Sequence, residues 1–142
     1  FSPMVLQHSK EDGPLIKRLI ERIPQDIDIR EAHDPLEVKG LIGQCHGAVS
    51  SRFHGLVNAL SAGVPALATS WSHKYQHLME DFHCIELLLS SETSNDALEQ
   101  KLQLMLKDPG RPRMVTRLRA AAARQEQEID RMWEDVLACI RR

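Results

Sequence analysis

Short apolar runs and helically spaced apolar positions alternate along the first hundred residues of the chain. Runs typical of strands lie at 4–9, 26–32, 47–51, 64–71 and 84–89. Apolar residues recur at helical spacing in 12–23, 34–45, 53–62, 72–82 and 94–108. Gly63 and Pro65 follow the third helical segment, where glycine and proline commonly end a helix. The pattern predicts strands and helices in strict alternation.

This order of elements predicts the fold class. Strands that alternate with helices through short links form a parallel sheet with helices on both faces and right-handed crossovers. We therefore expect an α/β, Rossmann-like domain over residues 1–110. Its second helix should bury Leu36, Val38, Leu41 and Ile42, and its helix at 94–108 should turn inward Leu98, Leu102, Met105 and Leu106.

The last segment, 111–142, carries one long apolar stripe. Its members are Met114, Leu118, Ala121, Gln125, Ile129, Met132, Trp133, Val136, Leu137 and Ile140. This spacing predicts one long C-terminal helix. We expect the helix to pack its stripe across the domain body, and the alternative is a helix that pairs with itself or with a partner.

Composition and charge narrow the class of protein. The 142 residues carry a net charge of -2, which gives no general attraction to nucleic acid. No apolar run has the length that a membrane span requires, and the three cysteines lie far apart without a CxxC pair. We expect a soluble protein of the reducing cytoplasm. Because the chain opens with Phe1 and lacks a signal-peptide pattern, we also expect a fragment of a longer protein.

Candidate chemistry gathers between the third strand and the third helix. Ser50, Ser51, Arg52 and His54 follow a strand of a predicted parallel sheet, where ligands collect, and they open a helix whose N-terminus attracts anions. The arginine offers a planar fork for phosphate or carboxylate, and the histidine can exchange a proton near neutral pH. These residues suggest an anion site with an acid/base group. A helix cap, a surface ion pair and a carbonyl contact are the ordinary alternatives for Ser51, Arg52 and His54.

The stretch SSRFHGLVNALSAGVPALATSWSHKYQHLMEDF, residues 50–82, resembles the signature region of the polysaccharide pyruvyl transferases. In that family an arginine, an apolar residue and a histidine precede an apolar helix, a Gly-x-Pro turn, a strand and a lysine. Here these are Arg52, Phe53 and His54, then Gly63 and Pro65, then Lys74 after Trp71.

The resemblance implies a fold, a reaction and roles for residues. The fold would be the C-terminal, donor-side half of a two-domain transferase of the GT-B type, whose missing N-terminal domain would help to hold the acceptor. The long helix at 111–142 would then cross back toward that missing domain. The reaction would move the pyruvyl group of phosphoenolpyruvate onto two hydroxyls of a sugar or polysaccharide precursor as a ketal. Arg52 and Lys74 would clamp the anionic donor, His54 would act as acid or base, and Ser50 and Ser51 would assist.

The sequence is also compatible with two other functions. One is a nucleotide-sugar-binding domain of a GT-B glycosyltransferase or epimerase, for which Glu92 is the available ribose-binding carboxylate. The other is a non-catalytic interaction module that uses the C-terminal helix. We expect no metal, because His73 and His77 have no third ligand at suitable spacing, and no cofactor, because the chain lacks a dinucleotide-binding or Walker motif.

Overall fold

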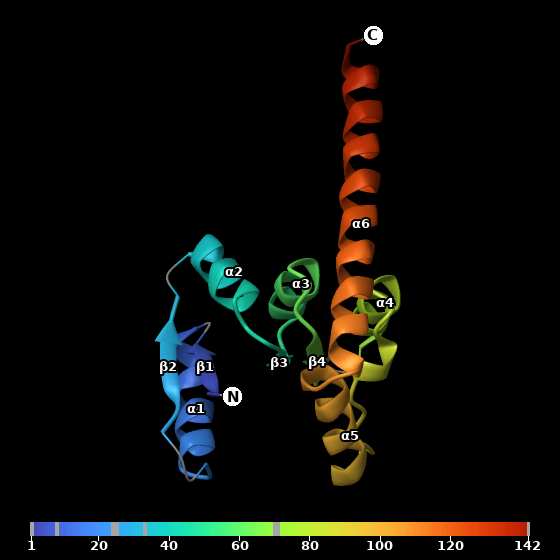
Figure 1. Cartoon of the computed structure of the whole chain (residues 1–142). Helices are drawn as coiled ribbons and strands as arrows, with labels where there is room; N and C mark the ends of the chain where they lie inside the picture. Colours follow the sequence, from blue (N-terminus) through green and yellow to red (C-terminus); the bar gives the residue numbers. More distant parts are fainter. Residues whose placement is uncertain (1, 8, 24–25, 33, 70–71, 142) are drawn as a thin grey trace. The chain divides into compact units, whose positions relative to one another are not determined.

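Parallel strand pairs form the β-structure of this protein. The computed structural model describes residues 2–7, 9–23, 26–32, 34–69 and 72–141 (Figure 1). Within these ranges β1 (Met4–Gln7) pairs in parallel with β2 (Asp28–Glu31), and β3 (Ala48–Ser50) pairs in parallel with β4 (Ala66–Ala68). The register sets Val5 opposite Ile29 in the first pair and Val49 opposite Leu67 in the second.

Six α-helices are present in the described part of the chain. They are α1 (Gly13–Ile20), α2 (Pro35–Gly43), α3 (Phe53–Ser61), α4 (His73–Asp81), α5 (Asn95–Leu106) and the 31-residue α6 (Gly110–Ile140). None of the described helices has the length and apolar character to cross a membrane. The prediction of an α/β chain with parallel strands and a long C-terminal helix is confirmed.

The chain divides into two units, residues 1–40 and residues 41–142. The first contains β1, β2 and α1, and its buried apolar side chains include Ile16 and Val38. The second contains β3, β4 and the helices from α3 onward, and it holds most of the buried apolar residues. The predicted division at residue 110 stays a prediction.

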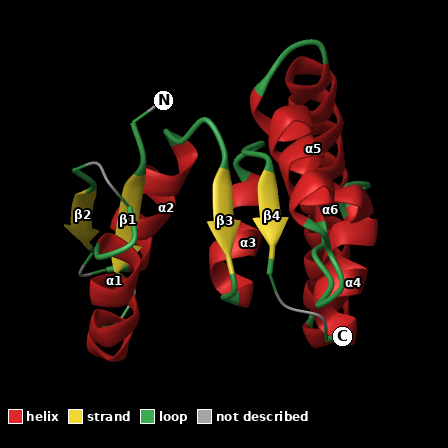
Figure 2. Cartoon of the chain, turned by 90° about the horizontal axis from the view of Figure 1, so that it is seen from below, coloured by secondary structure: helices red, strands yellow, loops and turns green. Residues whose placement is uncertain are grey.

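The second unit is built on α3 and the β3–β4 pair. Figure 2 shows β3 and β4 side by side with α3 against them, and α5 beside α6. Leu56, Ala59 and Leu60 of α3 are fully buried, as are Ala66 and Ala68 of β4. The chain turns from α3 into β4 at Gly63, whose φ of +74° lies in the region that glycine adopts without strain. This turn directs the chain back to pair β4 with β3.

Two predicted strands differ from the structure. Residues 84–89 do not form a fifth strand: Ile85–Leu87 is a 3-10 helix, and only Leu88 makes an isolated parallel bridge, to Ala68. Cys84 and Leu87 are both fully buried, and this spacing of three residues suits a helical turn rather than a strand. The predicted fourth strand at 64–71 is confirmed only over Ala66–Ala68, and its positions 70 and 71 lie outside the described residues.

Several predicted core positions also differ. Val38 and Ile42 of α2 are buried, but Leu36 is 81% exposed because it points about 200° around the helix from Val38. Leu41 is half-buried. In α5 only Met105 is fully buried, whereas Leu98, Leu102 and Leu106 are half-buried.

Candidate functional site

The turn from β3 into α3 brings the predicted site residues to the end of a parallel strand. Ser50 is the last residue of β3, and its carbonyl oxygen accepts a hydrogen bond from the backbone N–H of Thr69 at 3.1 Å. The strand pair therefore extends to the point where the candidate residues begin. This is the edge at which ligands bind in parallel α/β sheets.

The hydroxyl of Ser50 fixes the backbone of Arg52. Its Oγ accepts a hydrogen bond from the Arg52 N–H at 3.0 Å and donates one to the Arg52 carbonyl at 3.1 Å. A short hydroxyl side chain often stabilises a turn in this way. Gly55 leaves room for it, since a Cβ at that position would lie 2.7 Å from the Ser50 Oγ.

Arg52 is the residue that precedes the first turn of α3. It is the N-cap residue, with extended φ and ψ of -94° and 129°, and the helix begins at Phe53. The side chains of Ser51, Arg52 and His54 are exposed. The first N–H groups of a helix have no acceptor within the helix, so they and the guanidinium together favour an anion at this end.

Lys74 approaches the same turn from α4. Its Nζ lies 5.1 Å from the centroid of the Phe53 ring and 5.3 Å from the centroid of the Tyr75 ring. Both distances are in the range of a cation–π contact. The structure therefore brings the ammonium over the side chain that separates Arg52 from His54 in the sequence.

Tyr75 joins α4 to the turn, and sequence reasoning missed it. Its ring is buried, its Oη donates a hydrogen bond to the carbonyl oxygen of Ser51 at 2.8 Å, and it meets Phe53 edge-on with centroids 5.6 Å apart. The available signal was modest: Tyr75 is the single tyrosine of the chain and directly follows Lys74. A buried tyrosine usually finds a partner for its hydroxyl, and here that partner is the site's own backbone.

The two basic residues of the stretch 51–100 both lie at this turn. Residues 51–100 contain six acidic residues but only two lysines or arginines, and these two are Arg52 and Lys74. The fold brings both to one turn, so the cations of this stretch are concentrated where the helix N-terminus is.

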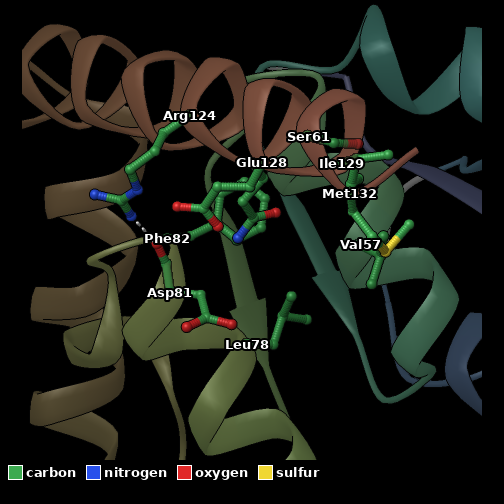
Figure 3. Close-up of a pocket in the computed structure, with 10 residues that line it drawn as sticks. Val57, Ser61, Leu78, Asp81, Phe82, Arg124, Glu128, Ile129 and Met132 are labelled. Carbon is green, nitrogen blue, oxygen red and sulfur yellow. Dashed lines mark hydrogen bonds between the residues drawn. The ribbon is translucent and has the colours of Figure 1, made fainter. Parts of the chain in front are cut away.

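An open groove with a volume of ≈ 690 Å³ lies elsewhere in the same unit, between α3, α4 and α6 (Figure 3). Its described lining residues include Val57 and Ser61 from the middle and the end of α3, and none of the five predicted site residues is among them. The groove is therefore a feature separate from the β3–α3 turn. Among the described residues, no group of three or more His, Cys, Asp or Glu side chains could hold a metal ion.

The family model for polysaccharide pyruvyl transferases matches residues 2–73, half of the chain. The chain belongs to the polysaccharide pyruvyl transferase family. The match in this pyruvyl transferase family member contains Ser50, Ser51, Arg52 and His54, and it ends one residue before Lys74. A search of curated proteins found no match to the chain.

Proposed function

We propose that this member of the pyruvyl transferase family moves the pyruvyl group of phosphoenolpyruvate onto two hydroxyls of one sugar during polysaccharide synthesis. The observation that carries the proposal is the position of the Lys74 ammonium over Phe53, the residue between Arg52 and His54 in the sequence, at a turn that the family match includes. Phosphoenolpyruvate carries a phosphate and a carboxylate, so its binding requires two cationic partners at a short separation.

The reaction can be written with all atoms conserved. One sugar hydroxyl oxygen bonds to C2 of phosphoenolpyruvate, and C3 gains a proton to become a methyl group. The second hydroxyl oxygen then bonds to C2 as the C2–O bond to phosphate breaks. One hydroxyl proton in effect supplies the methyl group, the other leaves with inorganic phosphate, and the product is a cyclic ketal that retains the carboxylate.

Each site residue has a part in this proposal. The Arg52 guanidinium and the N-terminus of α3 bind one anionic end of the donor, and the Lys74 ammonium binds the other. His54 gives a proton to C3 and accepts one from the attacking hydroxyl, since an imidazole can do both near neutral pH. The Ser50 hydroxyl, which bonds to the main chain of Arg52, positions that residue, and the Ser51 hydroxyl assists at the donor.

A donor site alone does not complete this reaction. The resemblance to GT-B transferases implies a second, N-terminal domain that faces the donor site and holds the acceptor sugar. In that arrangement the β3–α3 turn and Lys74 form the donor side, and transfer requires both sides.

The test is calorimetric titration of the chain with phosphoenolpyruvate and, separately, with a uridine diphosphate sugar. We expect phosphoenolpyruvate to bind and Arg52→Ala to weaken binding at least about tenfold, which corresponds to about 1.4 kcal/mol. Arg113→Ala, at an exposed position of α6, is the matched control and should leave binding unchanged. Binding of the nucleotide sugar alone would replace the proposal with a glycosyltransferase or epimerase function.

A second variant separates binding from chemistry. His54→Gln keeps a hydrogen-bonding side chain but cannot exchange a proton near pH 7. We expect it to bind phosphoenolpyruvate as the unmodified chain does and, in the two-domain enzyme that also holds the acceptor, to lower acceptor-dependent phosphate release by a factor of about 10² to 10⁴. Unchanged phosphate release would remove His54 from the proton transfers.

A further inference from the structure

The apolar stripe of α6 passes from a buried to an exposed environment along one helix. Met114, Leu118 and Ala121 are 2%, 0% and 1% exposed, whereas every described residue from 126 onward is exposed. The last turns of α6 extend beyond α3 and α4 of the same unit (Figure 1). We name the six large apolar residues of this exposed half the tail stripe: Ile129, Met132, Trp133, Val136, Leu137 and Ile140.

The tail stripe is an unusual surface for a helix in water. Its members are between 38% and 74% exposed, and they follow one another on a projecting segment. Contiguous apolar surface of this kind marks an interaction site, and a helical segment of about 12 residues gains little stability on its own. The tail stripe is also continuous with the groove of Figure 3, because Ile129 and Met132 line that groove together with Leu78 and Phe82.

The order of the tail stripe is symmetric about the point between Glu134 and Asp135. Reflection about that point exchanges Ile129 with Ile140, Met132 with Leu137, and Trp133 with Val136. Two copies of this helix placed antiparallel about a two-fold axis at that point would therefore set each apolar residue level with an apolar residue of the other copy. Such self-complementarity is the requirement for an isologous interface.

The charges on the same segment distinguish antiparallel from parallel pairing. Acidic residues occupy positions 126, 128, 130, 134 and 135, and Arg141 follows the last apolar position. In the antiparallel pair Arg141 of one copy lies level with Glu128 of the other, and within about one helical turn of Glu126 and Asp130. In a parallel pair each of these charges would lie level with its own copy. Glu134 and Asp135 lie level with a carboxylate of the other copy in either arrangement, so only the charges toward the two ends distinguish them. There the antiparallel pair sets Arg141 near acidic residues, which favours that arrangement.

We propose that the tail stripe is a self-association surface, on which α6 of a second copy of this chain packs antiparallel and covers the exposed half of the helix. The partner's helix end lies over Ile129, at the mouth of the groove. The occupant is a second copy rather than an unrelated protein or the N-terminal domain that the resemblance implies, because the apolar positions and the end charges of this one segment complement themselves.

The first test is the association state of the chain, measured by sedimentation velocity over a range of concentrations. We expect a dimer, and we expect Trp133→Glu to weaken dimerisation at least tenfold. Ala138→Glu is the matched control, because it adds the same charge to the same segment but points about 200° around the helix from Val136. A chain that stays monomeric at all concentrations, or a dimer that Trp133→Glu leaves intact, overturns the proposal.

Disulfide trapping tests the orientation and does not depend on Trp133. In a Cys139→Ser background, chains with Ile129→Cys are mixed with chains with Ile140→Cys and oxidised. Antiparallel pairing predicts covalent dimers in the mixture and few in either chain alone, since each cysteine is about 16 Å along the helix from its own copy. Efficient trapping of either variant with itself indicates parallel pairing and overturns the antiparallel assignment.

Discussion

The Tyr75 hydroxyl donates a hydrogen bond of 2.8 Å to the carbonyl oxygen of Ser51, and so ties α4 to the turn that begins α3. The two residues lie 24 positions apart in the sequence. Because Lys74 directly precedes Tyr75, the same bond sets where the lysine enters the site. Tyr75 is a positioning residue: it contacts the backbone of the site and the ring of Phe53.

Replacement of Tyr75 by phenylalanine should loosen this connection without a loss of packing. We expect Tyr75→Phe to lower the free energy of unfolding by about 0.5–1.5 kcal/mol, the usual net contribution of one hydrogen bond, in urea unfolding. His77→Ala, on an exposed position of the same helix, is the control and should change the stability little. Equal stabilities of Tyr75→Phe and the unmodified chain would show that the bond contributes nothing.

Gly55 should tolerate no side chain. In Gly55→Ala the new Cβ would lie 2.7 Å from the Ser50 Oγ, so the hydroxyl must give up its bonds to Arg52. We expect a loss of about 1–3 kcal/mol in unfolding free energy and weaker phosphoenolpyruvate binding. Gly40→Ala in α2, where a Cβ meets no atom within 4 Å, should instead be neutral or stabilise the chain by up to about 1 kcal/mol. Similar effects of the two substitutions would contradict the close approach of Ser50 to Gly55.

Lys74 should contribute to donor binding through its charge. We expect Lys74→Met, which keeps most of the apolar side chain over Phe53, to weaken phosphoenolpyruvate binding roughly tenfold, and Lys74→Arg to restore most of the affinity. The measurement is calorimetric titration at low and moderate salt, because a charge contact weakens as salt rises. Lys107→Met, at an exposed position after α5, provides the control. Equal affinity of Lys74→Met and the unmodified chain would exclude the lysine from the donor site.

The three cysteines should react with thiol reagents at very different rates. Burial, together with the nearby Glu86 carboxylate, raises the pKa of Cys84 to about 12, and burial also raises the pKa of Cys45, whereas Cys139 is exposed. Because the thiolate is the reactive form, we expect Cys139 to react first at pH 8 and Cys84 to react only after unfolding. Prompt labelling of Cys84 in the folded chain, identified by mass spectrometry, would contradict its burial.

The same raised pKa has a consequence for stability. Above about pH 9 the Cys84 thiol of the unfolded chain loses its proton, whereas the thiol of the folded chain retains it. The contribution of Cys84 to the free energy of unfolding is therefore complete below about pH 9 and falls as the pH rises toward about 12. We expect the loss of stability between pH 9 and 11 to be smaller in Cys84→Ala than in the unmodified chain, as measured by urea unfolding at each pH. Parallel profiles for the two chains would indicate that Cys84 titrates normally.

The sequence explains part of the arrangement of the candidate residues. Ser50, Arg52 and His54 are neighbours in the sequence, so the strand-to-helix transition at residue 51 was enough to place them together. Lys74 was expected near Arg52 only because adjacent parallel strands end at one edge, and the structure sets its Nζ over Phe53. Their roles in catalysis remain predictions. Tyr75 lies at helical spacing with the buried Leu78, Met79 and Phe82, but that pattern is the same whether or not its hydroxyl holds another segment.

Local pattern therefore determined most of the helices and strands, where most of them begin, and which family the chain belongs to. The spacing of apolar residues predicts which face of a helix is apolar, but it does not predict which segment packs against that face. Leu118 and Ile140 belong to one stripe in the sequence, yet the first is fully buried and the second is 74% exposed. Only the tertiary structure decided this, together with the 3-10 helix at Ile85–Leu87 and the meeting of Tyr75 with Ser51. Each depends on contacts between distant segments, whose free energy exceeds the small local preferences that a sequence pattern expresses.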